Sequence, residues 1–434
     1  MEFVTQGEKL KRLRLQFNLR QKDLADENIT REFISMVEKE KRNFSKQNAI
    51  SIMKNILCKA EEKGITLNLD EEYIARDIKQ DAEKYCLEEL ENKPTKEECQ
   101  KLLEIVEKYD LQYAKVKILK RMGEIFLYDQ EPVQAFISYS KAMEILNRNN
   151  FIEEKALVFN NMGVCKLKLI QYEEAALYFN NSIFISNVIN NYEIYNKTLF
   201  NLILTYNKLG KEDELIRVVE ECNKRINKVK ENLIYIKVKV MESNYYEEKN
   251  QLDKSLIIYE NLVKDIDNNL NSENVRSLGL IYNNMASIKL KQKRYDESES
   301  YFDKSYQARL IYDREGVSHT LIDKSYLYIE LNLLDKAIED INEGIIICKK
   351  YNDYEYWITG LKQLEKIYLI QKNYDKLEQV YLDLMSLSVE NDTEKNRVYA
   401  INKLINLELL LKNIERAKFY SNKLNEYIET SLKM

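Results

Sequence analysis

The sequence predicts an all-α protein in which a small N-terminal helical bundle precedes a long solenoid of paired helices. Three observations support this fold class. The 434 residues include only 2 prolines and 9 glycines, too few to interrupt many helices. Small and aromatic residues recur about every forty positions from residue 116 onward. Before that point, Leu10, Leu13 and Phe17 follow the three-and-four spacing that is typical of one helix face.

The composition excludes several classes of protein. Apolar residues make up 44% of the chain and charged residues 32%, with no run of eighteen apolar residues that could cross a membrane. The N-terminus shows no charged start followed by an apolar stretch, so we expect no secretion signal and a cytoplasmic location. We therefore expect no contact with a membrane.

Catalytic and metal-binding signals are also missing from the sequence. The six cysteines form no Cys-x-x-Cys pair and are interpreted as small core residues. His319 is the single histidine, which argues against His-rich zinc sites and against a nucleophile with a histidine base. No glycine loop for phosphate is present. We expect neither an enzyme nor a cofactor.

Residues 1–66 are predicted to form a separate basic domain of four helices. This segment carries 14 lysines and arginines against 10 acidic residues, a net charge of +4 within a chain of net charge −5. A first helix ends near Phe17 and a second covers residues 21–26. Thr30 and Ser45 are placed to cap the third and fourth helices. The positive charge favours an anionic partner but is also compatible with an ordinary solvated surface.

This head resembles the DNA-binding domains of the Xre/Cro-repressor family over roughly residues 7–60. The resemblance rests on Leu-Arg-Gln-Lys-Asp-Leu-Ala at 19–25, on the apolar pair Ile34 and Val37, and on Arg14 and Glu38, which form a buried ion pair in that family. It implies a helix-turn-helix fold that binds double-stranded DNA. The chain departs from the family at Asn28 and Glu40, where glycine is usual.

The same resemblance implies two classes of DNA contact. The residues expected to contact phosphates are Gln21, aided by its helix N-terminus, and Lys41, Arg42, Asn43 and Lys46. The residues expected to contact base edges in the major groove are Arg31, Glu32, Phe33, Ser35 and Met36. Phe33 and Met36 have a competing interpretation as core residues. Arg31 is the principal candidate, because its guanidinium can grip a guanine through two hydrogen bonds.

Residues 116–434 are predicted to contain about eight repeats of two helices each. The repeats begin near Val116, Ala156, Asn196, Ile236, Gly279, Ser318, Ile358 and Val398, at spacings of 39 to 43 residues. The pattern is similar to the tetratricopeptide repeat, lengthened from its usual 34 residues, and implies a right-handed superhelix. Residues 67–115 are expected to form a connector, with helices around residues 70–92 and 95–109 and a hinge near residues 64–70.

The sixth position of each repeat is expected to face the inner side of the solenoid. The residues at this position are Arg121, Asn161, Asn201, Met241, Asn284, Asp323, Gln363 and Lys403. Asn160, Asn207, Asn244 and Asn283 are further polar candidates on the first helices. Carboxamides both donate to and accept from a peptide bond. The polar residues at the sixth position, except Lys403, are therefore predicted to bind a peptide, together with Asn207 and Asn244. The alternative is that these residues are polar only because the inner surface is solvated.

An Xre-like head joined to tetratricopeptide-like repeats resembles the RRNPP family of peptide-responsive regulators of Gram-positive bacteria. That resemblance implies a homodimeric transcription regulator for quorum sensing, which binds a palindromic operator under the control of a short signalling peptide. Two alternatives stay open. The protein could bind a response regulator or another protein, as Rap-like members do, or it could be a scaffold without a small ligand.

Overall fold

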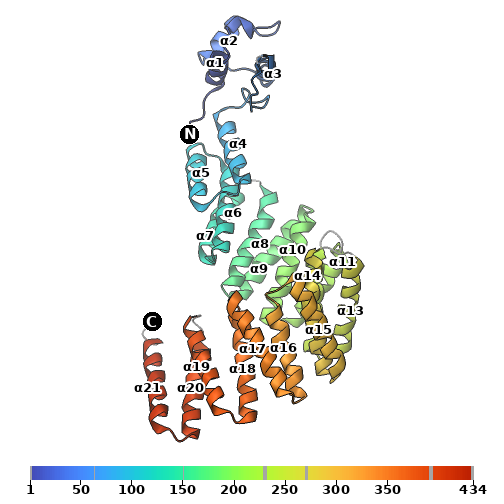
Figure 1. The fold of residues 1–434 in the computed structure, drawn as a ribbon. Helices are drawn as coiled ribbons and strands as arrows, with labels where there is room; N and C mark the ends of the chain where they lie inside the picture. Colours follow the sequence, from blue (N-terminus) through green and yellow to red (C-terminus); the bar gives the residue numbers. More distant parts are fainter. Residues whose placement is uncertain are drawn as a thin grey trace. The chain divides into compact units, whose positions relative to one another are not determined.

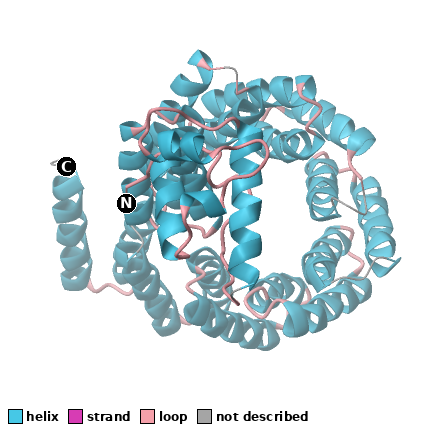
Figure 2. Ribbon diagram, turned by 90° about the horizontal axis from the view of Figure 1, so that it is seen from above, coloured by secondary structure: helices cyan, strands magenta, loops and turns pink. Residues whose placement is uncertain are grey.

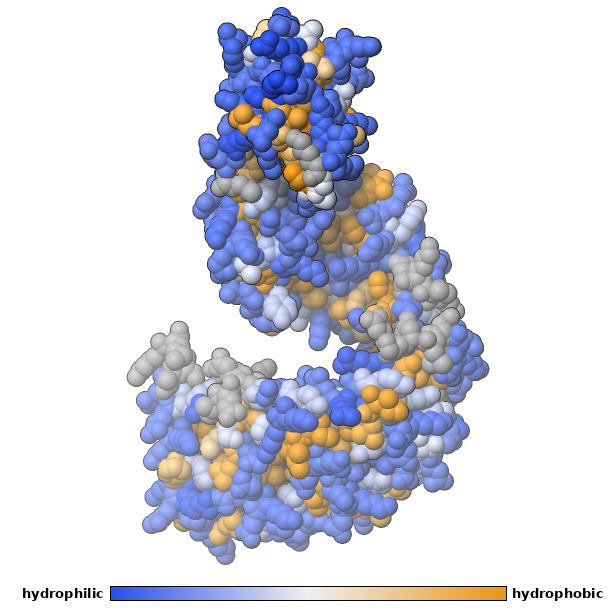
Figure 3. Space-filling view, turned by 45° about the horizontal axis from the view of Figure 1, so that its top comes forward, coloured by the Kyte–Doolittle hydropathy of each residue, from blue (hydrophilic) through white to orange (hydrophobic). Residues whose placement is uncertain are grey.

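The computed structural model describes residues 2–62, 64–149, 151–227, 232–268, 272–390 and 394–431. Within these ranges every regular element is a helix (Figure 2), which confirms the prediction of an all-α protein. None of the described helices is long and apolar enough to cross a membrane. Hydrophilic side chains cover most of the visible face of each unit in Figure 3, with apolar side chains in separate patches.

The chain divides into two compact units, Met1–Val218 (unit 1) and Val219–Met434 (unit 2). Unit 1 holds α1 (Gln6–Gln16), η1 (Gln21–Asp23), α2 (Arg31–Glu38), α3 (Lys46–Glu62), α4 (Ile78–Glu91), α5 (Lys96–Lys108), α6 (Gln112–Tyr128), α7 (Pro132–Arg148), α8 (Ile152–Lys168), α9 (Tyr172–Val188), α10 (Tyr192–Leu209) and the start of α11 (Glu212–Arg225) (Figure 1).

Unit 2 holds the remainder of α11 and then α12 (Asn232–Glu248), α13 (Leu252–Asn268), α14 (Ser272–Lys291), α15 (Tyr295–Tyr312), α16 (Val317–Glu330), α17 (Leu334–Tyr351), α18 (Tyr354–Gln371), α19 (Tyr374–Glu390), α20 (Glu394–Leu410) and α21 (Ile414–Ser431). From α6 onward the described helices form eight consecutive pairs.

Helices α1, α2 and α3, with the short η1, pack around one apolar core, and together they are called the head. Leu10, Ile34 and Val37 are fully buried in this core. The ion pair expected from the family resemblance is present, since the Arg14 guanidinium donates to both carboxylate oxygens of Glu38 at 2.5 and 2.9 Å. This pair ties the first helix of the head to the end of α2.

The predicted helix caps of the head are confirmed. The Thr30 hydroxyl accepts from the backbone N–H of Phe33 at 3.2 Å, and the Ser45 hydroxyl accepts from that of Asn48 at 3.2 Å. Glu40, at a position where the resembled family usually has glycine, has a left-handed backbone with φ of 57°. The helix exit therefore keeps the conformation that glycine would favour, at a cost in backbone strain.

The second helix of the head is shorter than the sequence predicts. It is a single 3₁₀ turn, Gln21–Asp23, rather than a helix over residues 21–26. The Asp26 carboxylate accepts hydrogen bonds from the backbone N–H groups of Asn28 and Ile29, both at 2.8 Å. Such a side-chain turn competes with helix for the same backbone donors and ends η1 early.

The segment after the head packs on the head core rather than starting a helix. Leu67, Leu69 and Ile74 contact this core, with Ile74 fully buried. The predicted helix start near residue 70 is therefore wrong, and α4 begins at Ile78. Asp77 caps it, because its carboxylate accepts from the Gln80 N–H at 2.8 Å while the Gln80 side chain accepts from the Asp77 N–H at 3.0 Å.

Each of the eight helix pairs reverses direction through one residue with a left-handed backbone. The reversing residues, with φ between 55° and 64°, are Gln130, Ile170, Gly210, Asn250, Lys293, Asn332, Lys372 and Lys412. The next residue then donates its N–H to a carbonyl five positions earlier, as from Gln171 to Lys166 at 2.9 Å. Only one of these eight positions is glycine, which explains how so many turns form in a glycine-poor chain.

Two glycines allow paired helices to approach closely. A Cβ atom on Gly123 would lie 2.5 Å from the Tyr139 ring, and one on Gly163 would lie 2.5 Å from the Phe179 ring. Both rings are fully buried. The small residues of the repeat pattern therefore mark the places where an aromatic ring of the second helix rests on the first helix.

Replacement of Ile170 by glycine is expected to stabilise the protein by about 0.5–1 kcal/mol. The Ile170 side chain is 71% exposed, so little packing is lost, and glycine removes the clash of a β-branched side chain with a left-handed backbone. Urea denaturation followed by circular dichroism measures the change. The control is Leu177→Gly, at an exposed position inside α9, which should destabilise by about 1 kcal/mol. Equal destabilisation by both variants would contradict a strained turn.

Candidate functional site

In unit 1, the first helices of the pairs carry predicted asparagines that are joined in one hydrogen-bonded network, called the asparagine network. Asn201 on α10 donates to the Oδ1 of Asn160 at 2.9 Å. Asn160 donates to the Oδ1 of Asn161 at 3.1 Å, and Asn161 donates to the Tyr139 hydroxyl at 3.2 Å. Thr198 adds a further donor to Asn160 at 3.2 Å. The asparagine network links three helix pairs, so these carboxamides hold one another in fixed orientations.

The remaining candidate residues of unit 1 lie outside the asparagine network. The Arg121 guanidinium is close to Glu124 at 3.4 Å, and its Nε atom is buried without a partner in the described part of the chain. Asn207 is exposed near the end of α10. Neither residue takes part in the asparagine network.

Unit 2 contains a polar pocket of about 380 Å³ formed by several first helices of the pairs. Its lining residues are Asn244, Glu247, Glu248, Leu280, Asn283, Asn284, Ser287, Lys291, Arg309, His319, Asp323 and Tyr356. These residues lie on α12, α14, α15, α16 and α18. Four predicted residues, Asn244, Asn283, Asn284 and Asp323, are thus brought together.

A buried tyrosine orients two of the pocket asparagines. The Tyr259 hydroxyl, on α13, accepts from Asn284 at 2.8 Å and donates to the Oδ1 of Asn244 at 2.9 Å. The Tyr259 side chain is fully buried, and burial raises its pKa to about 12, so the hydroxyl stays protonated at neutral pH. Tyr139 holds Asn161 in unit 1 by the same contact.

The pocket also holds a half-buried acid, Asp323, and a buried base, Arg309, and no ion pair joins the two in the part of the chain that the structure describes. Burial raises the pKa of Asp323, although a 2.7 Å hydrogen bond from Asn283 and the nearby Arg309 oppose this. Burial also lowers the pKa of Arg309. Its guanidinium donates a hydrogen bond to the carbonyl of Gly316. The Oδ1 of Asn283 is buried with no partner in the described residues. The pocket therefore offers acceptors and a guanidinium whose bonding capacity is only partly used.

His319 and Tyr356 form an aromatic wall of this pocket. Their rings stack with centroids 3.6 Å apart and planes 10° apart, and the His319 Nε2 lies 2.6 Å from a carboxylate oxygen of Asp353. Sequence reasoning missed His319, Tyr356 and Arg309 as pocket residues. Gly279 leaves room for Arg309, because a Cβ atom on Gly279 would lie 2.5 Å from the Arg309 side chain.

Gln363 and Lys403 lie in contacts between neighbouring pairs. Gln363 is 1% exposed, and its Oε1 accepts from the Ser325 hydroxyl. Lys403 forms an ion pair with Glu365 at 3.0 Å. The predicted inner position is therefore in the pocket for some repeats and inside the packing for others. Among the described residues, no group of histidine, cysteine, aspartate and glutamate side chains could hold a metal ion.

The candidate DNA contacts on the head separate into exposed and packed residues. The exposed residues are Arg31, Glu32, Lys41, Arg42, Asn43 and Lys46. Ser35 and Met36 are half-buried, and Phe33 packs against Phe44 with ring centroids 5.5 Å apart.

Gln21 is engaged within the head, because its amide donates to Glu38 at 2.8 Å. With only a three-residue η1 behind it, Gln21 lacks the long helix whose N-terminus was expected to attract a phosphate.

Residues 277–350 match the family model of the tetratricopeptide repeat. No curated protein matches the chain. Among solved structures, the apo form of the quorum sensor NprR from B. thuringiensis is 16% identical, with a TM-score of 0.54 over 81% of this chain and all of that one.

Two other solved structures share the fold. Aspartyl phosphate phosphatase F from Bacillus subtilis is 15% identical, with a TM-score of 0.52 over 89% of this chain and 96% of that one. A signal transduction ATPase with a tetratricopeptide repeat sensor, from Pyrococcus horikoshii, is 12% identical, with a TM-score of 0.51 over 98% of this chain and 70% of that one. The chain therefore has a tetratricopeptide-type all-helical fold.

Replacement of Asn160 by alanine is expected to lower the free energy of unfolding by about 1–3 kcal/mol, because the partners of a fully buried carboxamide lose their hydrogen bonds. Urea denaturation measures this loss. Asn207→Ala, at an exposed position on α10, is the matched control and should change stability by less than about 0.5 kcal/mol. Similar small effects of both variants would show that the asparagine network does not stabilise unit 1.

Proposed function

We propose that this protein is a cytoplasmic transcription regulator whose DNA binding is controlled by a short peptide. The observation that carries the proposal is the unit 2 pocket, where the Oδ1 of Asn283 and the Nε of Arg309 are buried without a partner in the described residues and Asp323 lies half-buried beside them. A peptide matches these groups, because it supplies N–H donors, carbonyl acceptors and charged groups at its ends or side chains.

The size of the pocket supports a peptide segment as the ligand. About 380 Å³ is near the lower end of sites for small ligands, so it accommodates only a few residues. The acceptors Asp323 and Asn283 suit an ammonium or guanidinium group, and Arg309 suits a carbonyl or carboxylate. Tyr259 holds Asn244 and Asn284 in place beforehand, which lowers the ordering cost of binding.

Five further residues are proposed to contribute to peptide binding, each within its own unit. They are Arg121, Asn161, Asn201 and Asn207 in unit 1 and Gln363 in unit 2. Asn161, Asn201 and Gln363 form internal hydrogen bonds, so their proposed contribution to binding is the orientation of neighbouring groups.

The DNA-binding part of the proposal rests on the exposed face of α2. Thr30 caps α2, and Arg31 and Glu32 extend from its first turn into solvent. A capped helix with an exposed arginine in its first turn matches the helices that enter the major groove. The resemblance to peptide-responsive regulators extends this to a homodimer on a palindromic operator. Control requires the peptide to bind one conformation of the array better than another.

Replacement of Asp323 by asparagine is expected to reduce peptide capture at least about tenfold, because the substitution removes the carboxyl group that would pair with a cationic group of the peptide. The probe is a pool of random heptapeptides passed over immobilised protein, with retained members quantified by mass spectrometry. Asp335→Asn, at an exposed position on α17, is the control and should retain the same peptides as the wild type. Identical retention by Asp323→Asn would remove Asp323 from the site, and no selective retention by the wild type would refute the peptide proposal.

Replacement of Arg31 by alanine is expected to weaken operator binding by about 1–3 kcal/mol and to relax specificity at one base pair. Fluorescence anisotropy with overlapping fragments of the DNA upstream of the gene measures the affinity. Arg12→Ala, at an exposed position on α1, should have a much smaller effect. Unchanged affinity for Arg31→Ala would show that Arg31 does not read the operator.

A second candidate function is binding of a response regulator or another protein, with the head as a bundle that does not bind DNA. The short η1 and the engagement of Gln21 by Glu38 favour this candidate. Failure of the wild type to shift any upstream fragment in a gel, together with capture of a response regulator, would support it over the DNA-binding proposal.

A further inference from the structure

The Lys9 side chain of α1 is buried where the head adjoins α4. It is 1% exposed, and its ammonium donates to the carbonyl oxygens of Tyr73 at 3.0 Å and Arg76 at 2.8 Å. It also forms an ion pair with the Asp81 carboxylate in the first turns of α4. The three N–H groups of the ammonium therefore have three acceptors, and all three belong to the chain beyond the head.

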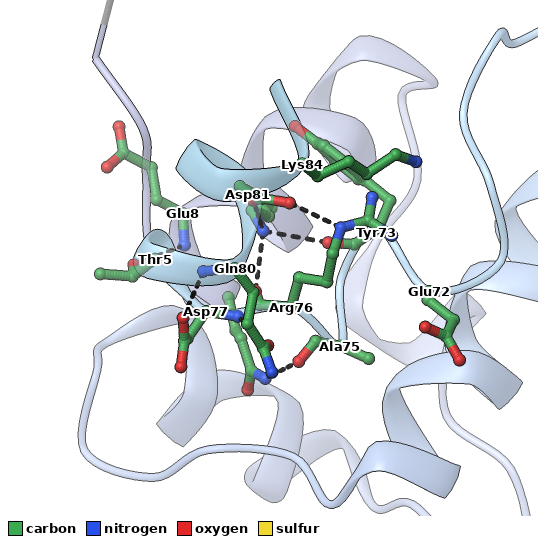
Figure 4. Close-up of polar contacts among 12 residues, drawn as sticks. Thr5, Glu8, Glu72, Tyr73, Ala75, Arg76, Asp77, Gln80, Asp81 and Lys84 are labelled. Carbon is green, nitrogen blue, oxygen red and sulfur yellow. Dashed lines mark hydrogen bonds and ion pairs between the residues drawn. The ribbon is translucent and has the colours of Figure 1, made fainter. Parts of the chain in front are cut away.

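Opposite charges alternate outward from this contact, beginning with Asp81 and Arg76, which Figure 4 labels. Arg76 donates to Asp81 at 2.8 Å and to Asp70 at 2.6 Å, and Lys84 donates to Asp70 as well. Burial disfavours the Asp70 carboxylate, but Arg76 and Lys84 hold its pKa at about 2. Burial likewise lowers the pKa of Lys9, while Asp81 opposes that shift. The Asp70 carboxylate thus stays charged at neutral pH and keeps Arg76 and Lys84 in place.

A second polar contact lies beside Lys9. The Gln6 side chain, in the first turn of α1, donates to the carbonyl of Ala75 at 2.8 Å and accepts from the backbone N–H of Phe44 at 3.2 Å. It therefore joins the same connecting segment, residues 70–77, to the head.

Apolar packing between the head core and α4 itself is limited, although Leu67, Leu69 and Ile74 of the connecting segment pack on the head core. The core of the head and the core formed by α4, α5 and α6 are separate clusters that share no residue. Phe3 links the N-terminal segment to the second core, with its ring 5.8 Å from that of Tyr85 and 5.6 Å from that of Tyr109. Apolar contacts permit small rotations, whereas hydrogen bonds to two carbonyls and a carboxylate depend on direction.

We propose that Lys9 is the positioning residue that fixes the head on α4, so that the head, residues 70–77 and α4 move as one rigid body. When α4 moves, α2 then moves with it by the same rotation and translation. This inference goes beyond the proposed function, because it requires neither a peptide nor DNA. It identifies the mechanical link that any signal from the array to the head must use.

The test is the distribution of distances between the head and α5. Cys58 on α3 is exposed while the other five cysteines are buried, so a spin label attaches there selectively. Lys101→Cys provides the second label at an exposed position on α5. Double electron–electron resonance on the full-length protein should give one narrow distribution. Lys9→Met should broaden it at least about twofold, because the directional contacts are lost.

Lys11→Met is the matched control, since Lys11 lies on the same helix with an exposed side chain, and it should leave the width unchanged. Asp81→Asn is the second variant, because it keeps the side-chain shape and removes only the charge. It should also broaden the distribution, and it replaces Lys9→Met if circular dichroism shows that variant to be unfolded. Wild-type width in a folded Lys9→Met or Asp81→Asn protein overturns the proposal. Because no peptide or DNA is added, that result is distinct from a failure of the proposed function.

Discussion

The reversal of every helix pair through one left-handed residue is the constraint on which the array depends. With turns at positions such as Gln130, Ile170 and Gly210, the backbone conformation repeats at an interval of forty residues. Because of this interval, equivalent residues of successive first helices lie on equivalent helix faces. Ring contacts such as Tyr139 on Gly123 then set how closely the two helices of a pair approach. Side chains far apart in the chain become neighbours as a consequence, as Asn160 and Asn201 do.

This regular geometry has two different outcomes for buried polar groups. In unit 1 the asparagines satisfy one another, so the network from Asn201 to Tyr139 stabilises the packing of three pairs. In unit 2 the equivalent surface leaves the Oδ1 of Asn283 and the Nε of Arg309 without a partner among the described residues, beside the half-buried Asp323. Unused bonding capacity inside a protein is costly unless a function requires it. This difference is the physical reason for proposing the pocket of unit 2 as the ligand site.

The head illustrates how a small domain is oriented without a large apolar interface. Its own core is complete, with Leu10, Ile34 and Val37 fully buried. Its position on α4 depends instead on directional contacts from Lys9 and Gln6 and on the ring of Phe3. A junction of this kind combines a separately folded domain with a defined orientation. Such an arrangement suits a domain whose output depends on where a helix such as α2 is held.

The sequence by itself determined the all-helical class, the forty-residue period and the caps at Thr30 and Ser45, because these follow from local spacing and from hydrogen bonds within a few residues. It also indicated Asn244, Asn284 and Asp323, which share one face of successive repeats. Tertiary structure decided which carboxamides are engaged internally and brought Arg309, His319 and Tyr356 into the pocket. It also buried Lys9 beside Asp81. These outcomes depend on distances between side chains that lie tens of residues apart, and helix periodicity carries no information about those distances.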